Sequence, residues 1–208
     1  FLPNPGDYIQ ALDAATGDLG WEYKRKLPED LGKFLPVPSI NRNLAIYGNH
    51  IIDTSADDFV FALDTMTGKL AWETLIVDYR VTPAQETSGP IIANGKIFST
   101  RGCEYKFSPN GCIITAHDAK TGKELWRRRT IPKPGEPGDE TWAGAPYEKR
   151  WMTGVWGQLT YDPELDLVFY GSSGAGPASE AQRGTPGGTL AGTNTLTCTL
   201  SPAITSYT

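Results

Sequence analysis

The 208-residue sequence has little cysteine, methionine or histidine and no long apolar run. Its 3 Cys and 2 His complete no zinc-ligand spacing, so we expect His50 and His117 to be structural or exposed. No segment approaches the roughly 20 apolar residues of a membrane-spanning helix. No C-x-x-C-H sequence marks haem attachment. The net charge of −5 argues against nucleic acid or an anionic membrane surface as the main partner.

Glycine, proline and aromatic residues are plentiful instead. The chain has 23 Gly and 16 Pro, scattered throughout, and 11% of its residues are aromatic. Turn-forming residues at this density, together with large apolar side chains, are typical of many short strands joined by frequent turns. The composition therefore favours an ordered all-β fold over a helical bundle or a disordered chain.

One sequence pattern recurs along the chain. The pattern A-x-D-x-x-T-G-x-x-x-W spans residues 11–21, 62–72 and 116–126. Its five specified positions are identical in all three copies, so chance is a poor explanation. A period of about 50 residues with several strands per unit is typical of the blades of a β-propeller.

The chemistry of the repeat predicts a strand, a turn and a second strand. The Asp and Thr side chains can hydrogen-bond to turn amides, and the Gly supplies the positive φ that a tight reversal needs. The second strand carries a large flat side chain to bury, which is Trp21, Trp72 or Trp126. A hairpin of this kind cannot bury its apolar face alone. Neighbouring units are therefore predicted to stack, with these tryptophans locking one unit against the next.

Other segments complete this organisation. Residues 155–170 form a fourth predicted hairpin that lacks the Trp of the repeat. Residues 24–41 and 130–150 are rich in proline and charge, and we expect them to be loops that protrude from the blades, where function concentrates. The fold class is therefore all-β, with about three to four propeller blades present.

Four motifs outside the repeat add a family resemblance. They are Asn41-Arg42-Asn43, Thr87-Ser88-Gly89-Pro90, Gly102-Cys103-Glu104, and Trp156 ahead of Tyr161-Asp162-Pro163-Glu164-Leu165-Asp166. With the repeats, they resemble the pyrroloquinoline-quinone (PQQ) dependent, or quinoprotein, alcohol dehydrogenases over about residues 7–192. In that family, repeated tryptophans lock the blades of an eight-bladed propeller. The resemblance implies that this chain is a fragment of such a domain.

The resemblance makes Glu104 the metal-ligand candidate. In the family, the Glu of a Gly-Ala-Glu-like turn coordinates the metal, normally Ca²⁺, and Glu104 matches it with Cys103 in the Ala position. Carboxylate oxygens suit a hard cation; the alternative is a solvent-facing loop Glu. The second metal ligand of the family, an Asn, corresponds to Gly174, which offers only a backbone carbonyl. This departure leaves the identity and affinity of the metal open; the choice between Ca²⁺ and a lanthanide depends on residues near the missing catalytic base.

The resemblance also assigns three cofactor-binding candidates. Trp156 corresponds to the floor under the planar quinone, or else is another buried propeller Trp. Arg42 corresponds to the Arg that binds the polar edge of the quinone, or else is an exposed loop Arg. Thr87 can donate its hydroxyl to a cofactor carboxylate, or else caps the turn before Gly89.

The cysteines divide into a pair and a single residue. Cys103 and Cys112 bracket a loop containing Pro109-Asn110-Gly111, a turn that can bring them together, and an extracytoplasmic protein would oxidise them and so brace Glu104. The adjacent Cys-Cys ring common in the family is absent, because Pro36 and Val37 occupy those places. Cys198 lies in the tail and carries no prediction.

The end of the chain departs from the pattern. Residues 1–195 are assigned to the partial propeller and residues 196–208 to an anomalous or disordered tail without blade patterning. The catalytic Asp of the family corresponds to a position beyond residue 208, so no catalytic residue is assigned here. We therefore expect the isolated 208-residue chain to be inactive as a dehydrogenase.

Taken together, the resemblance implies a periplasmic PQQ- and Ca²⁺-dependent dehydrogenase that oxidises an alcohol or polyol. Its electrons would pass to a cytochrome c or a quinone. The alternative is a non-catalytic propeller that uses the same repeats as a scaffold or binding surface. The motifs at Arg42, Glu104 and Trp156 favour the enzyme, whereas Gly174 and the missing base weigh against it.

Overall fold

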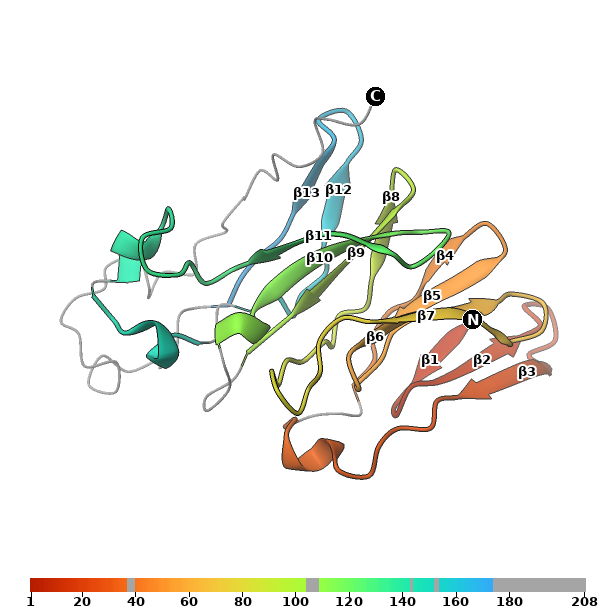
Figure 1. The fold of residues 1–208 in the computed structure, drawn as a ribbon. Coiled ribbons are helices and arrows are strands. Elements are labelled where there is room, and N and C mark those ends of the chain that lie inside the picture. The colour runs from red at the N-terminus through yellow and green to blue at the C-terminus, as the bar shows by residue number, and fades with distance from the viewer. Residues whose placement is uncertain (37–39, 104–108, 143, 152–153, 174–208) are drawn as a thin grey trace.

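The computed structural model describes residues 1–36, 40–103, 109–142, 144–151 and 154–173. These residues form antiparallel strands with a few short 3₁₀ helices (Figure 1). The strands are β1 (Leu2–Asn4), β2 (Tyr8–Leu12), β3 (Leu19–Lys24), β4 (Ala45–Tyr47), β5 (His50–Thr54), β6 (Phe59–Asp64), β7 (Leu70–Leu75), β8 (Ile91–Ala93), β9 (Lys96–Arg101), β10 (Ile113–Asp118), β11 (Glu124–Arg129), β12 (Thr160–Asp162) and β13 (Leu167–Phe169). The 3₁₀ helices are η1 (Leu31–Lys33), η2 (Pro109–Gly111), η3 (Asp139–Trp142) and η4 (Tyr147–Lys149).

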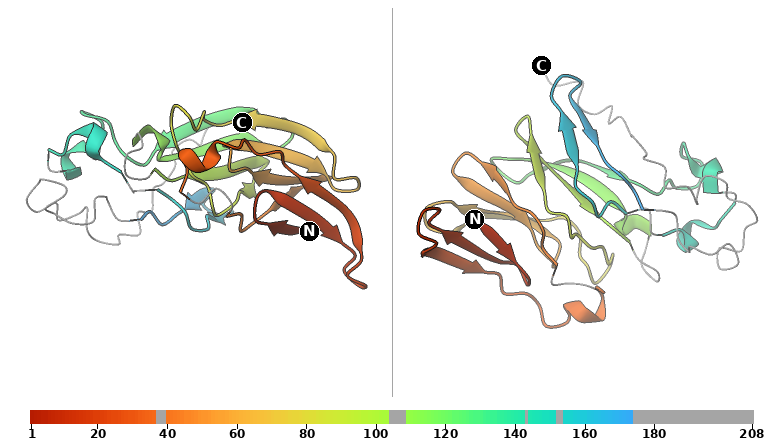
Figure 2. Two further views of the ribbon diagram at one scale, coloured as in Figure 1. Left: turned by 90° about the horizontal axis from the view of Figure 1, so that it is seen from below. Right: turned by 180° about the vertical axis from the view of Figure 1, so that it is seen from behind.

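The strands form four sheets that follow one another in chain order. The sheets are β1-β2-β3, β4-β5-β6-β7, β8-β9-β10-β11 and β12-β13, each with neighbouring strands paired in sequence order. Figures 1 and 2 show the sheets side by side in a fan. The first strands of the two complete sheets, β4 and β8, lie against each other. This is the blade arrangement of a β-propeller, and the predicted fold class is confirmed.

The repeated Asp and Gly build the turn of each blade as predicted. In the second sheet, one carboxylate oxygen of Asp64 accepts hydrogen bonds from the Met66 amide (3.1 Å), the Thr67 amide (2.9 Å) and the Thr67 hydroxyl (2.8 Å). Gly68 has a φ of +67° and donates its N–H to the Asp64 carbonyl at 2.9 Å. Asp118 organises the equivalent turn of the third sheet in the same way. A short local motif thus determines where each hairpin reverses.

The repeated tryptophans pack across the sheet boundaries. A Cβ on Gly68 would lie 2.5 Å from a ring carbon of Trp21, and one on Gly122 would lie 2.4 Å from ring carbons of Trp72. The indole N–H of Trp21 also donates to the Thr65 carbonyl of the next sheet at 2.9 Å. The glycine of the turn is therefore required twice, for its backbone angle and for the ring that covers it.

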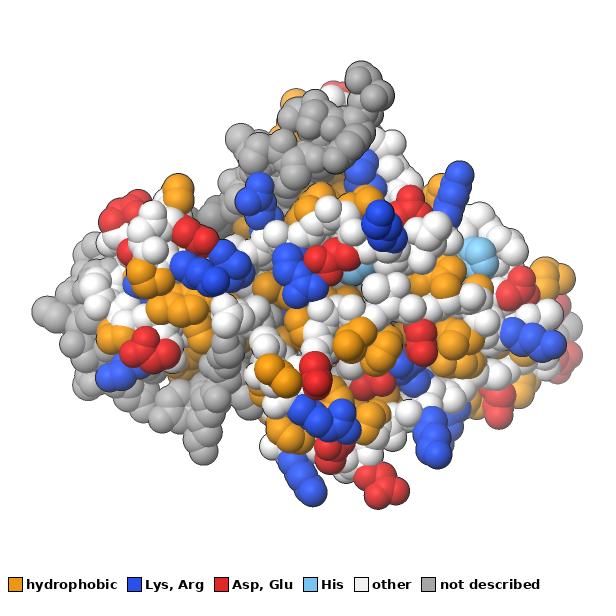
Figure 3. Space-filling view, in the orientation of Figure 1, with side chains coloured by type: hydrophobic (Ala, Val, Ile, Leu, Met, Phe, Trp, Pro, Cys, Tyr) orange, Lys and Arg blue, Asp and Glu red, His pale blue; other side chains and the backbone are white. Residues whose placement is uncertain are grey.

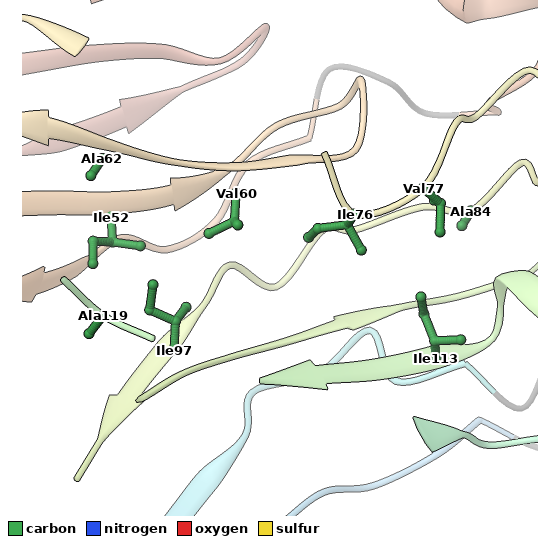
Figure 4. Packing of buried hydrophobic residues seen from close by; sticks show 9 residues of the cluster. All are labelled: Ile52, Val60, Ala62, Ile76, Val77, Ala84, Ile97, Ile113 and Ala119. Atoms are coloured by element: carbon green, nitrogen blue, oxygen red, sulfur yellow. The ribbon is translucent and has the colours of Figure 1, made fainter. Parts of the chain in front are cut away.

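Apolar side chains fill the space between consecutive sheets. Figure 4 shows Ile52 and Val60 of the second sheet facing Ile97 and Ile113 of the third. A similar cluster lies between the first and second sheets, around Ile9, Ile51, Phe61 and Leu63. Burial of these side chains is the main favourable term that holds one blade against the next.

The structure also differs from the sequence-based expectations in detail. Strand β1 was not predicted, because its Pro3 is unfavourable in most strands. The fourth hairpin is shorter than expected: its strands cover only residues 160–162 and 167–169. The predicted boundary at residue 195 lies outside the described residues. Within the described residues, no helix has the length and apolar character needed to cross a membrane.

Candidate functional site

The candidate residues lie at one end of the fan. Arg42 precedes β4, Thr87 precedes β8, and Trp156 precedes β12. Cys103 follows β9, and because β9 runs antiparallel to β8, its end is next to the start of β8. The fold therefore brings four segments that are far apart in the sequence to one edge of neighbouring blades.

Two of the predicted cofactor-binding residues contact each other directly. The guanidinium of Arg42 donates to the Thr87 hydroxyl at 2.6 Å and to the Thr87 carbonyl at 3.3 Å. Arg42 is exposed, whereas Thr87 is buried. The pair therefore places one cation and one hydroxyl from different sheets side by side.

The loops that carry this pair cross in close contact. Gly89 has a φ of +78°, and a Cβ there would lie 2.3 Å from the Asn43 carbonyl oxygen. The Asn43 side-chain amide donates to the Pro90 carbonyl at 3.2 Å. A larger residue at position 89 would push the loops apart, so Gly89 determines how closely Arg42 approaches Thr87.

The buried carboxyl group of Asp53 anchors the loop that carries Arg42. The Asn41 side-chain amide donates to Asp53 at 2.6 Å, and Asp53 is fully buried at the end of β5. Burial, reinforced by the negative charge of Asp7, raises the pKa of Asp53 well above its ordinary value. Its oxygen accepts the Asn41 amide hydrogen bond in either protonation state.

Glu86 organises the Thr87 loop, and the sequence analysis did not identify it. One carboxylate oxygen accepts from the amides of Thr87 (2.9 Å) and Ser88 (2.7 Å) and from the Ser88 hydroxyl (2.6 Å). The other accepts from the Thr100 amide (3.1 Å) and from the Arg101 guanidinium (3.0 Å). An acidic residue directly before a Thr-Ser-Gly turn was the only signal in the sequence.

Arg101 joins this loop to the second sheet. Its guanidinium also donates to Asp58 at 2.6 Å, and only 1% of the side chain is exposed. Burial raises the pKa of Asp58 to about 7, although the charge of Arg101 opposes that effect. Arg101 thus bridges two buried acidic groups from neighbouring sheets.

Trp156 is the one exposed tryptophan of the six in the chain, with 60% of its surface accessible. The three repeat tryptophans and Trp151 are half-buried, and Trp142 is buried. The Thr100 hydroxyl donates to the carbonyl of the preceding Val155 at 2.6 Å. Trp156 is therefore not buried between the sheets described here, and its role as the floor under a cofactor stays a prediction.

Further contacts join the Trp156 segment to the rest of the face. Gly154 lies so close to Gly102 that a Cβ on Gly154 would be 2.4 Å from the Gly102 Cα. The side-chain amide of Gln158 donates to the Ser88 carbonyl at 3.0 Å. The segments that carry Arg42, Thr87 and Trp156 thus form one connected face.

The metal-ligand candidate Glu104 and its expected partner Gly174 lie outside the described residues. The predicted disulfide between Cys103 and Cys112 is present, directly beside Glu104 in the sequence. In the part of the chain that the structure describes, no three His, Cys, Asp or Glu side chains are grouped to hold a metal ion.

The long segment 130–150 packs on this disulfide. Ile131, Trp142 and Ala145 form a buried cluster with the two cysteines. Arg150, itself buried, anchors the segment by donating to the Ala145 and Pro132 carbonyls, both at 2.9 Å, and to the Asp139 carboxylate at 2.6 Å. The described residues of this predicted loop therefore pack against the cystine and include η3 and η4.

Comparison with known proteins agrees with this architecture. Residues 1–187 match the PQQ family described as the glucose/ethanol/alcohol dehydrogenase beta-propeller domain. This chain belongs to that family. Quinohemoprotein alcohol dehydrogenase ADH IIB of Pseudomonas putida is 32% identical over 193 residues, which cover 86% of this chain and 27% of that protein. The chain thus spans about a quarter of the length of this curated relative.

Two solved structures show the same relationship. The quinohemoprotein alcohol dehydrogenase ADHIIG of Pseudomonas putida HK5 has 28% identity and a TM-score of 0.73, over 83% of this chain and 26% of that one. A europium-containing methanol dehydrogenase has 25% identity and a TM-score of 0.66, over 85% of this chain and 33% of that one. Both are larger than this chain, which corresponds to a part of each.

Proposed function

We propose that this propeller segment forms part of the cofactor-binding face of a periplasmic PQQ-dependent dehydrogenase that oxidises an alcohol or polyol. The proposed metal is Ca²⁺, or a lanthanide as in the europium-containing relative. The proposed electron acceptor is a cytochrome c or a quinone. The observation that supports the proposal is the Arg42–Thr87 pair, joined to the segment of the exposed Trp156 by the Gln158–Ser88 hydrogen bond.

The donor set on this face fits the chemistry of PQQ. A guanidinium and a hydroxyl suit the carboxylate and quinone oxygens at the edge of the cofactor. An exposed indole suits its planar ring system, because stacking buries a large area at a small entropic cost. When bound, PQQ supplies a two-electron acceptor for the hydride of the alcohol carbon, with a metal ion polarising its carbonyl.

In this proposal, the described residues of this chain bind the cofactor and orient it. Arg42 would compensate negative charge at the edge of the cofactor, and the Thr87 hydroxyl would fix the position of that edge. Trp156 would support one face of the ring system and exclude water from it. Glu104 is proposed as a metal ligand from the motif alone.

One feature supports the proposed location, and a second weighs against nucleic acid as a partner. The Cys103–Cys112 disulfide is typical of proteins that mature in an oxidising compartment. Charged side chains of both signs are interspersed over the face shown in Figure 3. That pattern differs from the single-signed patch of a nucleic-acid-binding protein.

Fluorescence titration of the 208-residue chain with PQQ, in the presence and absence of Ca²⁺, tests the proposal. We expect saturable quenching of tryptophan emission that depends on the metal and falls at least tenfold in affinity in Trp156→Ala and Arg42→Met. Arg128→Met, which removes an exposed Arg of the outer strand β11, is the matched control and should bind normally. Unchanged emission from folded wild-type chain would instead favour a scaffold.

A further inference from the structure

The buried network beneath the candidate face contains a carboxylate that contacts both halves of it. Glu86 is buried, yet it belongs to neither a repeat nor a motif of the family resemblance. Its carboxylate accepts hydrogen bonds from three successive amides, those of Thr87, Ser88 and Gly89. These bonds determine the path of the loop that presents the Thr87 hydroxyl to Arg42.

The same carboxylate also reaches the Trp156 side of the face. Its second oxygen accepts the Thr100 amide at 3.1 Å, and the Thr100 hydroxyl in turn donates to the Val155 carbonyl at 2.6 Å. Val155 directly precedes Trp156 in the sequence. Thr100 alone therefore links Glu86 to the Val155 carbonyl, directly before the exposed indole.

Arg101 determines which way this carboxylate points. Its guanidinium bonds to Glu86 at 3.0 Å and to Asp58 at 2.6 Å, so it is held from two sides. An ionised carboxylate is an acceptor only, and every group that faces Glu86 here is a donor. A glutamine would present an amide N–H₂ to one of these donor sets and could not satisfy both.

From this geometry we propose that Glu86 is the positioning residue of the candidate face. It fixes the position of Thr87 relative to Trp156. It acts on Thr87 through the loop amides and on the Trp156 segment through Thr100. It does so without contacting a ligand. The inference rests on the proposed function for the identity of the ligand, whereas the positioning itself is measurable on the chain alone.

The first measurement needs no cofactor. The indole N–H resonance of Trp156 is assigned in ¹⁵N-labelled chain by its loss in Trp156→Phe. We expect Glu86→Gln to shift or broaden this resonance and to speed amide exchange in residues 87–89, while the Trp21 indole stays in place. Glu73→Gln removes a carboxylate that is also paired with an arginine, Arg25, but lies on the outer strand β7. It is the matched control and should leave the Trp156 resonance unmoved.

A second variant separates the two arms of the network. Thr100→Val keeps the shape of the side chain and removes the hydroxyl, which donates to Val155 at 2.6 Å and lies 3.4 Å from the Glu86 carboxylate, while the Thr100 amide that donates to Glu86 stays. We expect it to move the Trp156 resonance but to leave amide exchange at residues 87–89 unchanged. This variant also tests the Trp156 arm if Glu86→Gln fails to fold.

PQQ titration then connects positioning with binding. In folded Glu86→Gln we expect the dissociation constant for PQQ to rise about tenfold, as for the loss of hydrogen bonds to a charged group. A folded Glu86→Gln or Thr100→Val chain with an unmoved Trp156 resonance would overturn the inference. If the wild-type chain does not bind PQQ while the resonance still moves, the proposed function fails and the positioning role stands.

Discussion

The second and third sheets have the same strand order and the same Asp-Gly turn. At the end of each sheet far from that turn, however, one is held by an ion pair and the other by a disulfide. The Ile76 amide donates to the Asp58 carbonyl at 2.8 Å, and the Thr130 amide donates to the Cys112 carbonyl at 2.9 Å. Asp58 and Cys112 are therefore equivalent positions of two blades. Asp58 is paired with Arg101 of the neighbouring sheet, whereas Cys112 is bonded covalently to Cys103.

The two sheets differ at a second equivalent position. Leu63 lies opposite Leu70 in the second sheet, and His117 lies opposite Glu124 in the third. His117 is fully buried, and neither ring nitrogen has a hydrogen-bond partner. An apolar cross-strand pair has thus been replaced by a titratable one at the same place in the fold.

This comparison shows that the repeat specifies the blade but not what joins one blade to the next. The ion pair between Asp58 and Arg101 connects two sheets and responds to pH. The disulfide closes a loop of the third sheet and responds to reductant. Equivalent positions of two blades therefore differ in the conditions that weaken their contacts.

The largest expected effect follows from removing the ion pairs between the sheets. Arg101→Met leaves the carboxylates of Asp58 and Glu86 buried without their cation. We expect the free energy of unfolding to fall by about 3–5 kcal/mol, measured by urea denaturation. Arg128→Met on β11 is the control, and a loss below about 1 kcal/mol in Arg101→Met would show that the pairs contribute little.

Removing the disulfide should have a smaller effect. The pair Cys103→Ala and Cys112→Ala opens a short loop, so we expect a loss of about 2–3 kcal/mol by the same method. Cys198→Ser, outside this pair, is the control. Equal stability of the double variant and the wild-type chain would mean that the segment packed on the cystine holds the loop without it.

The smallest expected effect concerns pH. Burial, with the nearby charges of Arg101 and Arg127, lowers the pKa of His117 to about 4, although Glu124 opposes the shift. In the unfolded chain His titrates near its ordinary pKa of about 6.5, so the unfolded state binds more protons as the pH falls from 6.5 towards 4. This group therefore contributes stability above pH 6.5 and loses it below.

His117→Leu, which copies Leu63, isolates that contribution. We expect the stability of wild-type chain relative to the variant to fall by about 2 kcal/mol between pH 7.5 and pH 5. Asp7 and Asp58, whose pKa values burial raises to about 6 and about 7, act in the opposite sense. They are common to both proteins and cancel in the difference. A pH-independent difference would mean that His117 titrates normally.

The parts of the site that were predictable from the sequence depend on local motifs. Arg42, Thr87 and Trp156 were assigned from motif resemblance; the structure shows the first two in contact and links the Trp156 segment to the Thr87 loop, while their cofactor roles stay predictions. Glu86, Arg101 and their contact with Asp58 were not predicted. Arg101 and Asp58 lie 43 residues apart, and no pattern in either segment indicates the other.

The sequence by itself determined the blades of this protein. Asp, Thr and Gly at fixed spacing specify each hairpin, because their hydrogen bonds and the positive φ of the glycine act within a few residues. Only the tertiary structure decided the connections between blades, including the pairing of Arg101 with two buried carboxylates and the exposure of Trp156. Those outcomes depend on which side chains meet across sheets, and burial makes an ion pair or a ring contact strong only after the sheets have come together.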